Sequence, residues 1–207
     1  MNKKILAFLV ALTLLVGCVI GGTLAWLTAT TDPVVNTFTV GDINIDLTET
    51  DTVNNAKNYD YIPGDILAKD PVVTVEKNSE NAYVFLKVVV ANNEVNDLTV
   101  IQWAVKNDWK YIVNGVEPAT TGVDFTQDGT YYFYQEYTKK TTDTNYQVLN
   151  GNTYDTGEVT VNSAITKTQV DTILETNKPS LTFSAAAVQK DNIGSLANAW
   201  AARPAGF

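Results

Sequence analysis

Residues 82–91 read AYVFLKVVVA, and this stretch decides the fold. Lys87 is its single charged residue, and the run is otherwise aliphatic or aromatic. A short apolar run of β-branched and aromatic residues is typical of a strand that is covered on both faces. We therefore predict a central strand here, with the rest of the sheet built around it.

Further strands are predicted on both sides of this run. Ile43, Ile45 and Leu47 alternate with polar residues, which is the period-2 pattern of a strand with one buried face. Val, Thr and Tyr are frequent in the later segments as well, and polar turn residues separate them. The other expected strands are residues 37–40, 72–76, two within 102–113, 131–137, 146–149, 157–161 and 181–188.

Helix signals come late in the chain. Thr166 and Gln169 have the spacing of a capping box, and a second short helix is expected over residues 195–202. Many short strands with few helices predict an all-β, jelly-roll-like antiparallel β-sandwich with one or two short helices late in the chain. The expected core residues are Phe38, Ile43, Ile45, Val84, Leu86, Val88, Trp103 and Leu181.

The N-terminus reads as an export signal. Lys3 and Lys4 precede an uncharged, mostly apolar run over residues 5–27. A short positive region followed by an apolar stretch and small residues is the pattern of a secretory signal. We predict a signal peptide over residues 1–25, cleaved between Ala25 and Trp26.

Two alternatives for this segment stay open. Residues 15–18 (LVGC) have the form of a lipobox, in which Cys18 would be the lipidated residue. The apolar run is also long enough to be retained as an uncleaved membrane anchor.

Composition excludes several classes of function. Without Lys3 and Lys4 the chain has 12 basic and 23 acidic residues, a net charge of −11, which disfavours nucleic acid and anionic membranes as ligands. The single Cys lies in the predicted signal, so no disulfide is expected in the rest of the chain. The chain has no His, which removes Ser-His-Asp triads and HExxH zinc sites.

Several short segments resemble the TasA/camelysin family of exported proteins with a SipW-type signal. The resemblance rests on residues 21–27 (GGTLAWL), 36–41 (NTFTVG), 63–65 (PGD), 69–71 (KDP) with Val73, 82–84 (AYV), 187–189 (AVQ) and 199–200 (AW). It implies a jelly-roll fold and export by a dedicated signal peptidase in a Gram-positive bacterium. It also implies either a biofilm-matrix fibre subunit or camelysin, a metallopeptidase of the cell envelope. The absence of His disfavours the peptidase.

Residues 26–36 are interpreted as an N-terminal leader or donor strand, and residues 37–207 as the β-sandwich domain. Thr28, Thr30, Val34 and Val35 are β-branched and suit an extended strand, whereas Pro33 interrupts pairing. Because this segment follows the cleavage site, it becomes free only after export. We expect it to insert into a neighbouring copy, although an ordinary first strand or an unpaired leader is the alternative.

The expected function is that of an exported structural protein, a fibre-forming subunit of a biofilm matrix or a cell surface that assembles by strand donation. The alternatives are a camelysin-like metallopeptidase and a monomeric surface adhesin. We expect no catalytic residues, metal site or cofactor. The expected partners are further copies of the chain and the signal peptidase, with membrane contact only through the signal before cleavage.

Three further motifs have a structural and a functional interpretation. Residues 63–65 (PGD) are expected to form a tight turn rather than an ion site. Asp42, Asp46 and Glu49, or Asp60 and Asp65, are candidate calcium ligands, with solvated carboxylates as the alternative. The aromatic residues 131–137 (YYFYQEY) would serve an adhesin if one face of this strand is exposed.

Overall fold

The computed structural model describes residues 3–7, 42–50, 60–118, 123–176 and 178–207. The chain divides into two units, Met1–Val40 and Gly41–Phe207. In the first unit residues 3–7 are helical. The predicted cleavage site, the donor segment and the expected strand over residues 37–40, with Phe38, lie outside the described residues.

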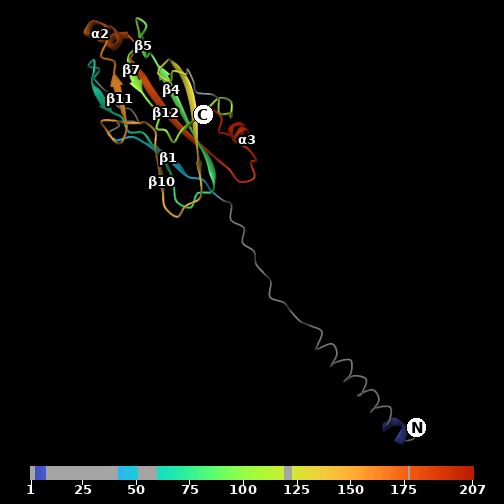
Figure 1. The fold of residues 1–207 in the computed structure, drawn as a ribbon. Helices are drawn as coiled ribbons and strands as arrows, with labels where there is room; N and C mark the ends of the chain where they lie inside the picture. The colour runs from blue at the N-terminus through green and yellow to red at the C-terminus, as the bar shows by residue number, and fades with distance from the viewer. Residues whose placement is uncertain (1–2, 8–41, 51–59, 119–122, 177) are drawn as a thin grey trace. The chain divides into compact units, whose positions relative to one another are not determined.

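The second unit is built from antiparallel strands, shown in Figure 1. The strands are β1 (Ile45–Thr48), β2 (Ile66–Ala68), β3 (Val72–Val75), β4 (Ala82–Ala91), β5 (Glu94–Val95), β6 (Leu98–Thr99), β7 (Ile101–Trp103), β8 (Lys110–Ile112), β9 (Gly129–Tyr137), β10 (Thr144–Gln147), β11 (Glu158–Val161) and β12 (Ser180–Gln189). They form sheets in the orders β12-β4-β9-β8, β1-β3-β10 and β2-β11-β7, with a small β5-β6 hairpin. Every pairing is antiparallel.

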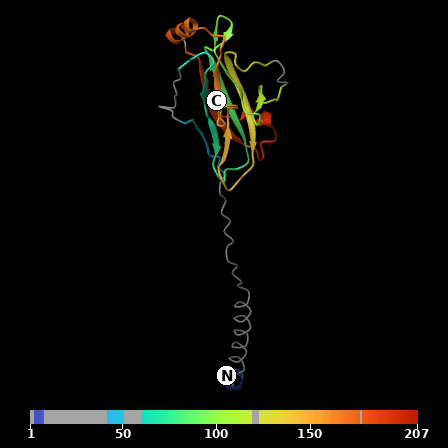
Figure 2. The ribbon, with the colours of Figure 1, turned by 60° about the vertical axis from the view of Figure 1, so that its left-hand side comes forward.

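The two three-stranded sheets lie opposite the four-stranded sheet. A bridge between Val105 and Leu149 joins the ends of β7 and β10. The main hydrophobic core draws residues from all three sheets. The expected all-β antiparallel sandwich is therefore confirmed. Figure 2 shows the strands running along the long direction of this unit, with helix α2 (Lys167–Thr176, orange) at one end.

Strand β4 lies at the centre of the four-stranded sheet, as its sequence predicts. It pairs with β12 along ten consecutive residues and with β9 on its other side. Its even-numbered side chains, including Val84, Leu86 and Val88, are fully buried in the main core. Since these three were expected in the core, the prediction for this strand is confirmed.

Two odd-numbered side chains of β4 contribute to a second core on the outer face of the sheet. Tyr83 and Phe85 pack there with Tyr134 of β9. The cover is helix α3 (Leu196–Ala201), whose Ala199 and Trp200 are buried. Ser195 caps this helix, because its side chain accepts a hydrogen bond from the N–H of Asn198.

Helix α2 (Lys167–Thr176) begins at the predicted capping box. The Thr166 N–H donates to Gln169 Oε1 at 2.9 Å, and the Gln169 N–H donates to Thr166 Oγ1 at 3.4 Å. Its Val170 and Ile173 pack with Val100 in a third small core, which the sequence analysis did not anticipate. Among the described residues, no helix has the length and apolar character needed to cross a membrane.

The predicted core is partly corrected. Trp103 is buried, but Ile43, Ile45 and Leu181 are only partly buried although they pack against the main core. Their pattern correctly identified the inward face. Ile45 and Leu181 remain partly exposed because β1 and β12 lie at the edges of their sheets, where no further described strand is hydrogen-bonded to them.

Candidate functional site

The candidate site is the free edge of β12, together with the partly covered core beside it. β12 is ten residues long, reads SLTFSAAAVQ, and contains no charged residue, proline or glycine. Its one strand partner within the described chain is β4. Exposed edges offer unpaired N–H and C=O groups that accept a strand from another chain.

The register shows which backbone groups point outward. The Lys190 N–H donates to the Asn81 carbonyl at 2.7 Å, directly after the last pair, Gln189 with Ala82. In an antiparallel ladder such bonded pairs alternate, so even-numbered residues of β12 bond to β4. The outward N–H and C=O groups belong to the odd-numbered residues Leu181, Phe183, Ala185, Ala187 and Gln189.

The first four of these residues also point their side chains at the main core. All four are only partly buried, whereas Val84 and Leu86 of neighbouring β4 are fully buried. The core is thus incompletely covered along β12. A strand added to this edge would both satisfy its backbone groups and bury apolar side chains.

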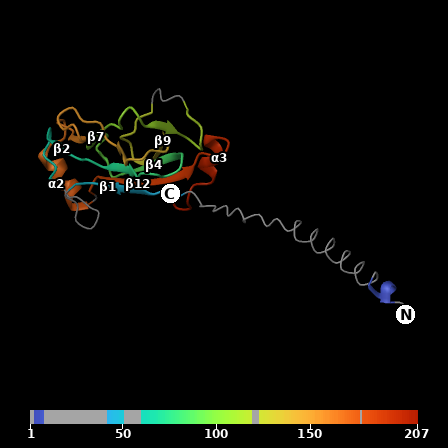
Figure 3. The ribbon, with the colours of Figure 1, turned by 90° about the horizontal axis from the view of Figure 1, so that it is seen from below.

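Strand β1 lies next to the free edge of β12. Figure 3 shows β1 and β12 side by side, with β4 and β9 beyond them. Ile45 and Leu47 of β1 are partly buried against the same core. Leu47 is a poorer acceptor of a strand, since its N–H already donates to Asp46 Oδ1 at 2.8 Å.

The other described edges are protected. β2, β7 and β8 have three residues each, and β1 and β10 have four. β1 carries Asp46 and β8 carries Lys110. Short length and charge are the usual means of blocking edge-to-edge association, and β12 has neither.

A buried ion pair lies next to the free edge of β12. Lys69 Nζ lies 2.9 Å from Glu49 Oε1, directly after the end of β1, and both side chains are largely buried. The same ammonium group lies 5.3 Å from the ring centre of Phe183 on β12. A cation and the face of an aromatic ring attract each other, so the contact between Lys69 and Phe183 helps hold this end of β12 in place.

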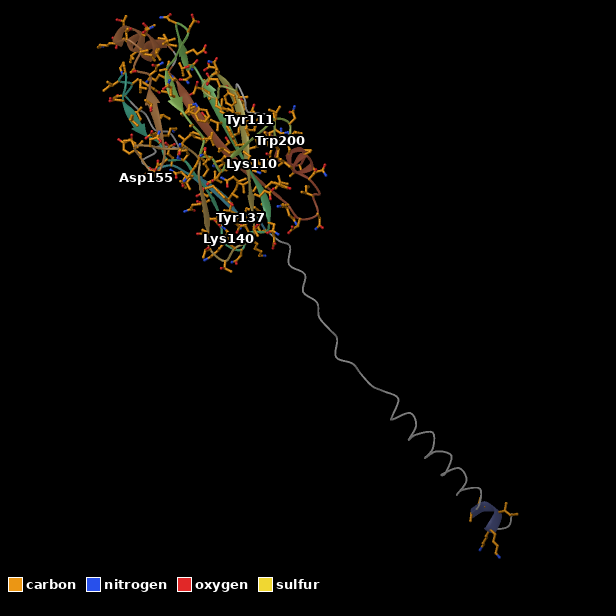
Figure 4. All side chains as sticks on the ribbon, in the orientation of Figure 1. Lys110, Tyr111, Tyr137, Lys140, Asp155 and Trp200 are labelled. Carbon is orange, nitrogen blue, oxygen red and sulfur yellow. The ribbon has the colours of Figure 1, made fainter. Side chains whose placement is uncertain are left out.

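The aromatic side chains of β9 pack in or against the two cores, so this strand offers no exposed aromatic face to support the adhesin alternative. Phe133 and Tyr137 are buried in the main core, while Tyr134 is buried in the second core. Tyr132 packs on Trp200, with ring centres 4.8 Å apart. Figure 4 labels Trp200, which contacts Tyr132, and Lys110, whose Nζ lies over the ring of Tyr134. Helix α3 was predicted, but its position over β9 was not.

Burial also changes the acidity of this face. It raises the pKa of the Tyr134 hydroxyl, and the hydrogen bond from that hydroxyl to Glu117 raises it further. Lys110 Nζ lies 3.6 Å from Glu117 and 5.5 Å from the Tyr134 ring centre. The raised pKa keeps the Tyr134 phenol neutral at pH 7, so it acts as the hydrogen-bond donor to Glu117 in this cluster.

The candidate calcium ligands have separate partners. Asp42 Oδ1 accepts from the Ile43 N–H, Asp46 from Leu47, and Glu49 binds Lys69. In the ranges that the structure describes, no three acidic or cysteine side chains gather as metal ligands.

The PGD motif forms the expected turn. The Asp65 N–H donates to the Ile62 carbonyl at 3.0 Å, and Gly64 has φ +86°. The Gly64 N–H and the Asp65 carbonyl both bond to Val161, which joins the turn to the end of β11. Its role is therefore structural.

The predicted site residues Ala25, Trp26, Thr28, Thr30, Val34 and Val35 lie outside the described residues. The apolar pattern of residues 181–188 predicted a strand here, but not that this strand lies at an edge of its sheet. The one available signal was the absence of charge across residues 180–189. A buried central strand shows the same absence, so the signal alone does not separate the two.

Comparison with known proteins supplies no relative: no family model, curated protein or solved structure matches this chain.

Proposed function

We propose that this chain is an exported, non-enzymatic structural subunit that assembles into filaments by strand donation, with β12 as the acceptor edge. The observation that carries the proposal is the uncharged ten-residue edge of β12 beside an incompletely covered core. Main-chain hydrogen bonds supply affinity in such an arrangement, and side chains directed at the core fix the register.

The donor in this proposal is the segment of residues 26–36, which is similar in length to β12. Thr28, Thr30, Val34 and Val35 favour an extended conformation. Before cleavage the segment continues directly into the apolar signal, so cleavage on export would release it for pairing. This order of events prevents filaments from forming inside the cell.

A donor and an acceptor on different parts of one chain give a head-to-tail contact. Such contacts do not close on themselves unless the rotation between copies happens to form a ring. Repetition therefore produces a filament. The resemblance to the TasA/camelysin family supports the same function, as does a chain without His.

The donor is tested with two chains, one beginning at Trp26 and one at Thr37, at equal concentration and pH. Electron microscopy should show filaments from the longer chain alone. A synthetic peptide of residues 26–36, added in excess, should cap growth. If both chains stay folded monomers, or both polymerise equally, strand donation by this segment is wrong.

The acceptor is tested by blocking the edge of β12. Ala185→Pro removes an outward N–H and leaves the bonds to β4 in place, so it should abolish filaments. Asn145→Pro is the matched control, because Asn145 is exposed on the short edge strand β10. The Val148 N–H bonds to the Pro71 carbonyl, so even-numbered residues of β10 bond to β3 and the Asn145 N–H also points outward. Filaments from the Ala185→Pro chain would show that β12 is not the acceptor.

A further inference from the structure

We infer that, before assembly, the β12 edges of two copies pair with each other to form a two-fold symmetric dimer. The outward residues run from Leu181 to Gln189, with Ala185 in the middle. An antiparallel pair centred on Ala185 would match Ala185 with its own copy, Phe183 with Ala187, and Leu181 with Gln189. This is the register in which every outward N–H and C=O of β12 finds a partner.

The composition of the edge fits a second copy better than most partners. In a two-fold pair each residue near the axis lies close to its own copy, so any charge there would repel itself. β12 carries no charge on a chain whose net charge is −9. The edge is therefore free of the repulsion that the rest of this acidic surface would impose.

Side-chain size points to the same axis. The three residues at positions 185–187 are alanines, and the larger Leu181 and Phe183 lie towards one end. In this register the neighbours across the axis would be small residues, Ala185 with Ala185 and Ser184 with Ala186, so no bulky side chains crowd each other there. The four core-facing side chains, which are partly exposed in one copy, would be covered by the partner strand.

The contact is expected to be weak. A single added strand buries much less than the roughly 1,200–2,000 Å² of a stable interface. A weak pair blocks the edge while subunits are dilute and yields to a donor strand that makes the same bonds. This use of the dimer, as a reserve that delays polymerisation, rests on the proposed function, whereas the pairing itself rests on the geometry of β12.

Disulfide cross-linking tests the register. The full chain carries Cys18→Ser, so that a single new cysteine is present. Ala185→Cys places two Cα atoms about 5.5 Å apart across the axis, which a disulfide can span. Thr182→Cys is the control: this residue is more exposed, but its two copies would lie roughly 20 Å apart at about 3.4 Å per residue.

Under mild oxidation the Ala185→Cys chain should form covalent dimers at least tenfold faster than the Thr182→Cys chain. Equal rates, or faster cross-linking of Thr182→Cys, would overturn the dimer. Filaments from the uncrosslinked chain without selective cross-linking at Ala185 would leave the proposed function standing and remove the dimer. Selective cross-linking at residue 185, in a chain that forms no filaments once the disulfide is reduced, would support the dimer and contradict the proposed function.

Discussion

The side-chain amide of Asn93 pairs with the backbone of Ile101 as a neighbouring strand residue would. Asn93 Oδ1 accepts from the Ile101 N–H at 2.8 Å, and Asn93 Nδ2 donates to the Ile101 carbonyl at 2.8 Å. Nδ2 also donates to the Thr126 carbonyl at 2.7 Å. Asn93 is fully buried, so one side chain satisfies backbone groups at the start of β7 and in the turn before β9.

Replacing Asn93 by Ala should lower the free energy of unfolding by about 2–4 kcal/mol, because it leaves three backbone groups without partners. Urea titration measures the loss. Asn145→Ala is the control: that amide is exposed and makes one side-chain bond, to Thr74, so the expected change is below about 0.5 kcal/mol. Similar small values for both variants would show that water replaces the Asn93 amide.

Leu86→Ala should be more destabilising than Leu181→Ala, although both residues point at the main core. Leu86 is fully buried, and its truncation should cost roughly 2–5 kcal/mol. Leu181 lies on the open edge and should cost about half as much, since part of its surface already contacts water. Denaturant titrations of both variants make the comparison, and equal losses would mean that β12 is covered in solution.

This contrast shows what the sequence of β12 and β4 contains. The apolar pattern correctly gave both strands and, for β1, the inward face, because pattern depends on neighbours along the chain. It did not give their places in the sheet. That order depends on pairings such as Ser180 with Ala91, which join residues far apart in the sequence. The open edge, and hence the candidate site, follows from this order and was not predictable.

The second core was missed for the same reason. Tyr83 and Phe85 were expected to be buried, but no residue near them in the sequence indicates which segment packs over them. Trp200 supplies it, with its ring 5.7 Å from that of Phe85. The burial of Asn93 was equally hidden, since asparagines directly after a strand usually indicate a turn.

Gly115 holds the turn after β8 against helix α3, and its replacement by Ala should be costly. It has φ +79°, and an added Cβ would lie 2.8 Å from Trp200 Cβ and 3.0 Å from Ala197 Cα. Gly206 is a matched control, with φ +91° and open space around it. Gly206→Ala should cost about 1 kcal/mol from the backbone alone, and Gly115→Ala about 1–3 kcal/mol more from crowding.

Thermal unfolding measures both glycine variants, and near-ultraviolet circular dichroism reports on Trp200. We expect the tryptophan signal to change in Gly115→Ala and to stay constant in Gly206→Ala. Equal stability losses in the two variants would mean that α3 moves away from the turn without cost.

The carboxylate of Glu158 should make the turn before β11 sensitive to acid. Its Oε2 accepts from the Thr153 N–H at 2.7 Å and from the Tyr154 N–H at 3.2 Å. Hydrogen bonds from the backbone of Asn152 and Thr153 lower the pKa of Glu158 below its ordinary value of 4.5. A carboxyl whose pKa is lower in the folded state stabilises that state above its unfolded pKa and loses this contribution as pH falls through its folded pKa.

Glu158→Gln removes this titration and keeps one acceptor oxygen. We expect the variant to be less stable than the parent at pH 7, by an amount that stays constant down to about pH 6. As the pH falls below 4.5 the parent should lose stability faster, so the two curves of unfolding free energy against pH converge. Hydrogen exchange at the Thr153 and Tyr154 amides should follow the same course, because these groups lose their charged acceptor. Curves that remain parallel down to pH 3 would show that the charge of Glu158 does not hold this turn.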